Sequence, residues 1–286
     1  MKVALAVSSK TIDGVPDTAI LTAALEEAGH VVRLLDWCDD PVWDWPDLTL
    51  LHAPWDYTRK APAFLSWLDR VSAHAVLLNG AGIVNANIHK SYLLDLQRAG
   101  IEIPQSSLLR KGTALDLRQL QSCFGSNAVV VKPAIGAGGR RLERLSSVEA
   151  MMTSRVVGST ASLREDLLVQ RYEETIETLG EFSLVLLDGD LSHLISKKPR
   201  RGEYRVQAAH GGADGPIDID GNACMLAESL SPFVTEALYA RIDYVIGADG
   251  SPLLMELELT EPDLFLRYSA QAATRLVAGL SRRGAM

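Results

Sequence analysis

Three acidic residues near the end of the chain lie on two apolar segments that are predicted to form one β-hairpin. Glu256 and Glu258 are two positions apart, so both side chains project from one face of a strand. Asp243 lies on the preceding segment. The turn at Gly247–Gly250 places it opposite Leu254 or, with the turn centre moved by one residue, opposite Glu256. In either register Asp243 shares the face of the two glutamates.

These carboxylates indicate a cation. Three negative charges gathered on an apolar hairpin repel one another unless a cation lies among them. Hard oxygen ligands of this kind suit magnesium, which substrate phosphates usually help to coordinate. The alternative is an edge hairpin whose acids face solvent. Met255, Leu257 and Leu259 alternate with the glutamates and are expected to bury the opposite face, which favours a magnesium site on this hairpin.

A glycine-rich segment earlier in the chain has the composition of a phosphate-binding loop. Gly136, Gly138 and Gly139 follow an apolar run that ends in Lys132-Pro133. Closely spaced glycines let backbone N–H groups approach phosphate oxygens, and a nearby lysine supplies a positive charge. Two other phosphate loops are excluded, because Gly-x-x-x-x-Gly-Lys-Ser/Thr is absent and Gly-x-Gly-x-x-Gly fails at Arg141. A glycine-rich hairpin without a ligand is the alternative.

Basic side chains lie near the ends of the predicted elements in a definite order. Lys90 comes first, Lys132 adjoins the glycine loop, and Lys198 and Arg205 precede the acidic hairpin. Each of them alone is typical of a solvated surface charge. These basic residues therefore indicate a functional site only through their order relative to the glycine loop and the acidic hairpin.

The elements that must position these residues divide the chain into two kinds of structure. Up to about residue 85, short apolar segments alternate with helical patterns, which predicts a small, mostly parallel α/β domain. Its predicted strands are Val3–Val7, Val31–Leu35, Leu48–His52 and Ala75–Leu78, and its predicted helices are Asp17–Ala28, capped by Gly29, and Phe64–Val71. A helix is predicted over Ile88–Ala99. An antiparallel α+β part is then predicted from the strands Val129–Lys132, Leu167–Tyr172, Phe182–Leu187, Leu191–Ser196, Arg241–Ile246 and Leu253–Leu259.

Composition and charge exclude several classes of protein. The chain has 286 residues, a net charge of −8 and no apolar run long enough to span a membrane. Its richest basic stretch, Lys197–Arg205, is too short to predict a nucleic-acid partner. Cys38, Cys123 and Cys224 lie far apart and form no Cys-x-x-Cys pair. Neither a disulfide framework nor a zinc site is therefore expected, and the cytoplasm is the expected location.

These motifs, in this order, resemble the ATP-grasp family of ligases over essentially the whole chain. Asn85–Lys90 resembles the segment with the family's first nucleotide-binding lysine. Val131–Pro133 with the glycine loop resembles the second lysine and the mobile lid over the phosphates. Arg241–Asp243 and Met255–Glu258 resemble its magnesium carboxylates, although Asn is the commoner residue where Glu258 stands.

The resemblance implies an ATP-grasp fold of mixed α/β and α+β structure in three parts. These are an N-terminal parallel α/β domain at 1–86, a central lid subdomain at 87–170 and an antiparallel C-terminal subdomain with the metal site at 171–286. The implied cofactors are ATP and Mg²⁺, as one or two ions, with Mn²⁺ as an alternative.

The resemblance also implies which residues bind each group. Those expected to contact the nucleotide are Lys90, Lys132, Gly136, Gly138, Gly139, the hinge residues Gln170, Arg171, Tyr172 and Glu173, and the ribose-binding Glu181. Those expected to hold the metal are Asp243, Glu256 and Glu258. Lys198 and Arg205 are expected to face the γ-phosphate and the developing acyl phosphate. His210 is a candidate base or, as the alternative, a turn residue before Gly211.

Finer features resemble the branch of the family that contains a D-cycloserine-forming cyclo-ligase. They are His52–Tyr57, Glu203–Gln207 with His210–Gly212, and Glu256–Pro262. The resemblance implies that a small-molecule carboxylate, O-ureido-D-serine, is activated as an acyl phosphate and closed to D-cycloserine in antibiotic biosynthesis. The region around Trp55-Asp56-Tyr57 is expected to supply part of the substrate pocket, and the alternative for Trp55 and Tyr57 is that they are buried packing aromatics.

Three other functions stay open from the sequence. An intermolecular ligase that joins an amino acid or peptide to an amine would need the same nucleotide and metal residues. An ATP-binding regulatory module without turnover has less need of the full acidic set. A nicotinamide-dependent oxidoreductase would need a glycine fingerprint that the first βα turn, Ser8–Gly14, lacks. A homo-oligomer, most simply a symmetric dimer, is expected from general frequency alone.

Overall fold

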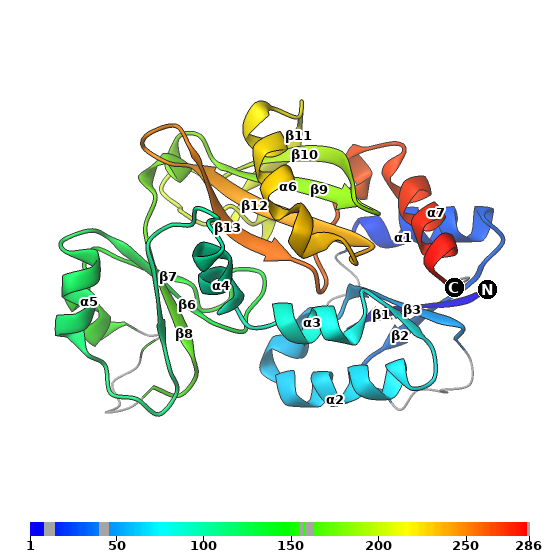
Figure 1. The fold of residues 1–286 in the computed structure, drawn as a ribbon, viewed down its shortest axis with the longest axis horizontal. Helices are drawn as coiled ribbons and strands as arrows, with labels where there is room; N and C mark the ends of the chain where they lie inside the picture. The colour runs from blue at the N-terminus through cyan, green and yellow to red at the C-terminus, as the bar shows by residue number, and fades with distance from the viewer. Residues whose placement is uncertain (9–14, 40–45, 155–156, 158–162, 285–286) are drawn as a thin grey trace.

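The N-terminal part is a four-stranded sheet in the order β2-β1-β3-β4, with every neighbouring pair parallel. The computed structural model describes residues 1–8, 15–39, 46–154, 157 and 163–284 (Figure 1). The elements of this part are β1 (Lys2–Val7), α1 (Asp17–Glu27), β2 (Val31–Asp36), β3 (Leu48–Ala53), the 3-10 helix η2 (Trp55–Arg59), α2 (Ala61–Ser72) and β4 (Val76–Leu78). The predicted parallel α/β arrangement is confirmed, and residues 9–14 of the first βα turn lie outside the described part.

Local sequence explains these elements. Residues Val3–Val7 of β1 are all buried, as expected for an apolar run in a sheet whose two faces are both covered. Helix α1 is followed by Gly29, whose φ of +80° is the left-handed conformation that commonly ends a helix.

The central part is a four-stranded antiparallel sheet in the order β5-β8-β6-β7. Its elements, with the two helices that precede it, are α3 (Ala81–Asn87), α4 (Tyr92–Arg98), β5 (Ser106–Leu109), α5 (Leu117–Phe124), β6 (Val129–Pro133), β7 (Glu143–Leu145), the 3-10 helix η3 (Glu149–Thr153) and β8 (Leu167–Arg171). The boundary expected at residue 170 falls inside β8, and the division into three domains stays a prediction.

The helix predicted over Ile88–Ala99 is confirmed only over Tyr92–Arg98, which is α4, and its first four residues are not part of an α-helix. Residues 88–91 separate α4 from α3, which ends at Asn87. Lys90 lies in this break, and its backbone N–H donates to the carbonyl of Ala134, just beyond β6, at 2.8 Å. A tertiary contact therefore overrides the helical periodicity of this segment.

The C-terminal part is a five-stranded antiparallel sheet in the order β11-β10-β9-β12-β13. Its elements are the 3-10 helix η4 (Glu174–Glu177), β9 (Glu181–Leu187), β10 (Asp190–Lys198), η5 (Ala208–His210), β11 (Ala213–Ile217), α6 (Gly221–Val234), β12 (Tyr239–Ile246), β13 (Pro252–Glu258), η6 (Leu266–Tyr268) and α7 (Ala272–Gly284). The predicted hairpins at 188–190 and 247–250 are both present.

The C-terminal part packs directly on the N-terminal domain. Helix α7 lies beside α1, close to both ends of the chain (Figure 1). One apolar core joins Leu21 and Leu25 of α1 to Leu276 of α7 and to Leu187 and Tyr239 of the large sheet. Among the described residues, no helix is both long and apolar enough to cross a membrane.

Candidate functional site

Of the two registers predicted for the acidic hairpin, the structure has the one in which the turn centre is moved by one residue. Asp243 lies opposite Glu256 and Arg241 lies opposite Glu258, because a β-bulge interrupts the pairing between Asp243 and Tyr244. The predicted acidic face is therefore confirmed. Asp243 is only 3% exposed, which rules out a solvent-facing role for it.

The same bulge alters the opposite face of the hairpin. Tyr244 pairs with Leu254, so Met255 is the extra residue of β13. Leu254, Leu257 and Leu259 enter the main core, whereas Met255 is only partly buried and packs on a separate apolar cluster. The prediction that Met255 buries this face together with Leu257 and Leu259 is therefore wrong for Met255.

Glu256 is held between the two lysines expected to bind phosphate. Lys90 Nζ donates to Glu256 Oε2 at 3.1 Å, and Lys132 Nζ donates to Glu256 Oε1 at 2.8 Å. Burial alone would raise the pKa of Glu256, but Lys132 and Lys90 outweigh it and hold that pKa well below its usual range. Residues from the α3–α4 break, from β6 and from β13 thus meet at one point.

The third lysine of this cluster is Lys197, although Lys198 was the expected residue. Lys197 Nζ is hydrogen-bonded to Glu181 and, at 3.2 Å, to Asp243 Oδ1. Lys197 is buried, while Lys198 is exposed on the opposite face of β10. The expectation for Lys198 is corrected, because a β-bulge between Leu191 and His193 shifts the pairing and places Lys197 opposite Glu181.

The other carboxylates of this face, Asp243 and Glu258, also have close hydrogen-bond partners. Arg241 Nη2 donates to Asp243 Oδ2 at 2.8 Å and also binds Glu258. Ser183, which pairs with Asp243 across the sheet, donates its hydroxyl to Asp243. Burial raises the pKa of Glu258 to about 7, in spite of Arg241, because Asp243 and Glu256 add to the rise. Burial likewise raises the pKa of Glu181, against the effect of Lys197.

The donor set on this face fits a divalent cation in its chemistry. Asp243, Glu256 and Glu258 present hard carboxylate oxygens from one side of one hairpin. In the described part of the chain, no group of three His, Cys, Asp or Glu residues is already arranged as a metal site. Lysine and arginine side chains neutralise the three acids instead.

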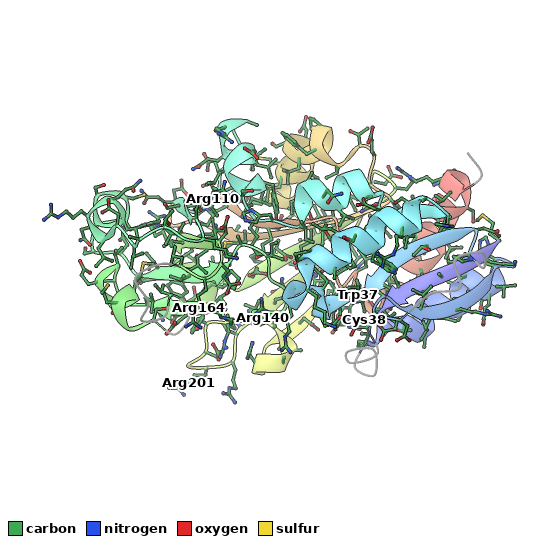
Figure 2. All side chains as sticks on the ribbon, turned by 90° about the horizontal axis from the view of Figure 1, so that it is seen from below. Trp37, Cys38, Arg110, Arg140, Arg164 and Arg201 are labelled. Carbon is green, nitrogen blue, oxygen red and sulfur yellow. The ribbon has the colours of Figure 1, made fainter. Side chains whose placement is uncertain are left out.

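The glycine loop adjoins this cluster. Lys90 Nζ donates to the carbonyl of Gly136 at 3.0 Å. Gly138 and Gly139 have φ of +60° and +67°, a conformation that other residues adopt only at a cost. Arg140 continues the loop, and its Nη2 donates to the carbonyl of Thr58 in η2 at 3.4 Å. Figure 2 shows Arg140 between the central sheet and the N-terminal domain.

Gly139→Ala is expected to raise the KM for ATP about tenfold, equivalent to about 1.4 kcal/mol. A Cβ at this position would lie 3.1 Å from Gln207 Oε1 and 3.6 Å from His210 Nε2, so either the Gln207 side chain or the loop would have to shift. Gly189→Ala is the matched control, because Gly189 also has positive φ but nothing lies within 4 Å of its Cβ position. Steady-state kinetics at varied ATP should separate the two variants, and equal KM values would contradict the role of the loop.

The hinge residues lie at the end of β8, an inner strand of the central sheet, and directly after it. Gln170 is buried, and its Nε2 donates to Ser106 Oγ at 3.0 Å. Within the described residues, Gln170 Oε1 has no hydrogen-bond donor although it is buried. Such an acceptor is costly unless a ligand or water satisfies it. Arg171 pairs with Glu173 at 2.9 Å, and Tyr172 donates its hydroxyl to Glu177.

Arg205 and His210 lie outside the acidic cluster. Arg205 forms its ion pair with Glu203 at 2.7 Å and stacks over the ring of Tyr204. His210 belongs to the short helix η5 and faces Gly139 of the loop. The structure therefore does not bring either residue into contact with Asp243, Glu256 or Glu258.

Sequence reasoning missed three residues of the cluster, Lys197, Arg241 and Ser183. Arg241 carried a usable signal, since a residue two positions before Asp243 on a strand must share its face. Ser183 carried the same signal relative to Glu181. Lys197 carried none, because its face depends on the bulge in β10.

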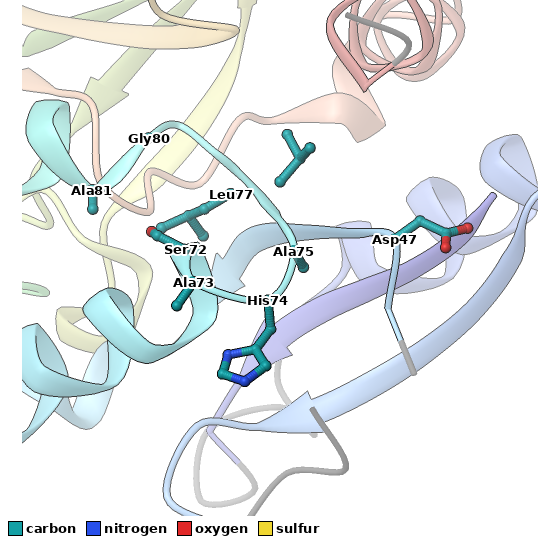
Figure 3. Close-up of a pocket in the computed structure, with 9 residues that line it drawn as sticks. Asp47, Ser72, Ala73, His74, Ala75, Leu77, Gly80 and Ala81 are labelled. Carbon is teal, nitrogen blue, oxygen red and sulfur yellow. The ribbon is translucent and has the colours of Figure 1, made fainter. Parts of the chain in front are cut away.

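A surface groove of about 670 Å³ lies apart from these residues. It is lined by Asp47, Ser72–Leu77, Gly80 and Ala81 (Figure 3). None of the predicted site residues contributes to it, and it is wide open to solvent. The groove is therefore not the site described here.

Comparison with known proteins agrees with the geometry. Residues 108–266 match the family model described as prokaryotic glutathione synthetase, ATP-grasp domain, and residues 3–79 match the D-cycloserine synthetase DcsG N-terminal domain. The chain is 28% identical to the cycloserine biosynthesis protein DcsG of Streptomyces lavendulae over 279 residues, which is 93% of each chain. It is 30% identical to the glutathione synthetase of Synechocystis sp. over 244 residues, 82% of this chain and 72% of that one.

Solved structures of related proteins have the same fold as this chain. The crystal structure of D-cycloserine synthetase DcsG is similar with a TM-score of 0.90 at 26% identity, over 99% of this chain and 100% of that one. The D-alanine–D-alanine ligase of Bacillus anthracis has a TM-score of 0.73 at 17% identity, over 100% and 97%, which is a likeness of fold alone. The chain therefore belongs to the ATP-grasp family: it is an ATP-dependent carbon–nitrogen ligase that uses a divalent metal ion and acts on a small-molecule substrate.

Proposed function

We propose that this chain activates the carboxylate of O-ureido-D-serine with ATP and closes the molecule to D-cycloserine. The observation that carries the proposal is Glu256 between Lys90 and Lys132, because it joins the expected phosphate-binding lysines to the expected metal-binding hairpin. The likeness to DcsG supports this choice among carbon–nitrogen ligations, since it extends over both chains and includes the N-terminal domain.

The first step is transfer of the γ-phosphoryl group of ATP to the substrate carboxylate, which gives an acyl phosphate and ADP. In this step Lys90 and Lys132 neutralise phosphate charge, which is the main task of a protein in phosphoryl transfer. The loop Gly136–Arg140 covers the site and excludes water, which would otherwise hydrolyse the acyl phosphate. Lys197, in place of Lys198, is the proposed cation near the γ-phosphate.

Nucleotide recognition is assigned to the hinge. The orphaned acceptor Gln170 Oε1 suits the amino group of adenine, and the backbone of residues 171–173 adjoins it. Glu181 stays the proposed partner of the ribose hydroxyls, with Lys197 beside it. Asp243, Glu256 and Glu258 would hold the divalent ion, proposed to be one or two Mg²⁺ with Mn²⁺ as a substitute. When bound, the ion neutralises charge on the phosphate oxygens.

The second step is ring closure. The nitrogen next to the side-chain oxygen of the substrate attacks the acyl carbon, a C–N bond forms and inorganic phosphate leaves. The carbamoyl group is lost with one water as carbon dioxide and ammonia. Because nucleophile and electrophile belong to one molecule, the chain needs only to hold it folded. Arg205 is proposed to stabilise the acyl phosphate and His210 to accept the nitrogen's proton once the loop moves them inward.

An intermolecular carbon–nitrogen ligase is the second candidate. The match of residues 108–266 to the glutathione synthetase domain favours it, because this part contains the hinge, the glycine loop and the acidic hairpin. Both candidates share every nucleotide residue. Only the product distinguishes them.

The experiment is to incubate the purified protein with ATP, Mg²⁺ and O-ureido-D-serine, and with the L-isomer in parallel. ADP release is followed by a coupled assay and the product by mass spectrometry. We expect ADP and D-cycloserine from the D-isomer. ADP release only after a second amine is added, with a joined product, would favour the intermolecular ligase. A protein that binds ATP with Mg²⁺ but releases no ADP with any carboxylate would be a regulatory module.

We also propose that the enzyme is located in the cytoplasm. The three cysteines, Cys38, Cys123 and Cys224, are all free thiols, which suits a reducing cytoplasm. A homodimer stays a prediction, to be tested by light scattering.

A further inference from the structure

Glu261 is a buried acid that the mechanism above leaves without a task. It is 5% exposed, and its carboxyl is hydrogen-bonded to the Tyr57 hydroxyl. The four other buried or half-buried acids of the site each have a lysine or arginine partner: Glu181, Asp243, Glu256 and Glu258. No ion pair of the described chain includes Glu261. It is therefore the acid of this site that lacks a cation.

The segment that carries Glu261 is fixed firmly in place. Asn79 Nδ2 donates to the carbonyl of Leu259 at 2.7 Å, and Tyr239 donates its hydroxyl to the carbonyl of Thr260 at 2.8 Å. Trp55 Nε1 donates to the carbonyl of Glu261 itself at 3.1 Å. These bonds come from the carboxyl ends of β3 and β4 and from β12, so the Glu261 side chain is held where the N-terminal domain meets the acidic hairpin.

Glu261 also borders the reacting centre. It lies three residues after Glu258 and interacts electrostatically with Glu258, Lys90 and Arg241. Burial raises the pKa of Glu261 to about 8, and the negative charge of Glu258 adds to the rise. A buried carboxylate without a direct ion-pair partner is costly to ionise, and a bound cation would reduce that cost.

We propose that Glu261, oriented by Tyr57, binds the α-ammonium group of an amino acid substrate. This inference rests on the proposed function, in which the substrate is an α-amino acid. Its ammonium group is attached one carbon from the carboxylate that becomes the acyl phosphate, so its receptor must adjoin the metal and phosphate residues. Glu261 meets that requirement through its position after Glu258, and Tyr57 is brought to it by η2.

The competing explanation is that Glu261 is a neutral, purely structural acid. Glutamine copies the shape and hydrogen bonding of a protonated glutamate but cannot carry a negative charge. Glu261→Gln therefore separates the two roles. A structural acid tolerates the change, whereas an ammonium receptor loses its attraction for the substrate.

The test compares two substrates on two enzymes by ADP release. The substrates are O-ureido-D-serine and 3-(ureidooxy)propanoic acid, which lacks only the amino group. We expect Glu261→Gln to lower kcat/KM about 10²-fold for the amino acid, mainly through KM, because one partner of a buried charge pair is lost. For the analogue we expect a change of less than about threefold, because glutamine copies the shape and hydrogen bonding of a protonated Glu261. Glu228→Gln, at an exposed position of α6, is the matched control.

Each outcome decides one question. Equal losses on both substrates, or no loss on either, overturn the ammonium site while the proposed function stands. A wild-type enzyme that releases no ADP with O-ureido-D-serine overturns the proposed function and the inference with it. If thermal unfolding shows that Glu261→Gln is not folded, Glu261→Asp replaces it. This shorter acid should impair the amino acid more than the analogue, and equal impairment would overturn the site.

Discussion

Glu256→Gln is expected to lower kcat for ADP release by about 10²–10³-fold, the loss seen when one preorganised electrostatic group is removed. Glu256 accepts hydrogen bonds from Lys90 and Lys132 and belongs to the proposed metal-binding face. Glutamine keeps the length of the side chain but offers one oxygen instead of two and no charge. The two lysines would then lose their shared counter-ion and the metal would lose a ligand.

The measurement is steady-state ADP release at saturating ATP and Mg²⁺. Glu236→Gln, at an exposed position after α6, serves as the control, and it should keep wild-type kcat. Thermal unfolding of both variants shows whether a loss of activity reflects a loss of fold. If Glu256→Gln kept kcat within tenfold of the wild type while folded, the hairpin could not be the centre of the reaction.

Lys197→Met is expected to lower the free energy of unfolding by about 3–5 kcal/mol, as for removal of one partner from a buried ion pair. Lys197 neutralises Glu181 and Asp243, which are both buried. Without it Asp243 keeps Arg241, but Glu181 is left without an ion-pair partner among the described residues. Methionine preserves the apolar stem of lysine, so packing changes little and the loss reports the charge.

Lys198→Met is the matched control for this effect. Lys198 is the next residue of β10 but is exposed on the other face, so its change should stay within about 0.5 kcal/mol. Urea unfolding of the two variants, with the wild type alongside, gives both free energies. Equal losses would contradict the placement of Lys197 inside the cluster. A larger loss for Lys198→Met would contradict the exposed position of Lys198 on the other face of β10.

Alternation and order along the chain were enough to predict much of the site. Glu256 and Glu258 must share a face because they are two residues apart on a strand. Asp243 joins them in both registers considered, so its membership did not depend on the choice. The two lysines and the glycine loop were identified by their order relative to this hairpin, and the structure brings Lys90 and Lys132 onto Glu256.

What the sequence could not determine depends on contacts between distant segments. The bulge at Met255 selects the register of the hairpin, and the bulge in β10 exchanges Lys198 for Lys197. One extra residue in a strand moves the side chains that follow it to the other face of the sheet. The local sequence of these segments does not predict where such a residue is inserted.

The helix predicted over Ile88–Ala99 begins four residues later, at Tyr92, for a related reason. Its apolar periodicity is real, but the hydrogen bond from the Lys90 backbone to Ala134 breaks the helix. That bond places the Lys90 side chain at Glu256. Local propensity is weak beside a tertiary contact of this kind.

The sequence by itself therefore identified the candidate groups of the site, a glycine-rich loop, two lysines and a face of carboxylates, since these follow from residue type and spacing. The tertiary structure decided which cations neutralise that face and which acid is left without one. Trp55 and Glu261 are 206 positions apart, and only the packing of the N-terminal domain on the C-terminal sheet brings them together. Spacing along a strand is fixed by covalent geometry, whereas contacts between domains depend on the folding of the whole chain.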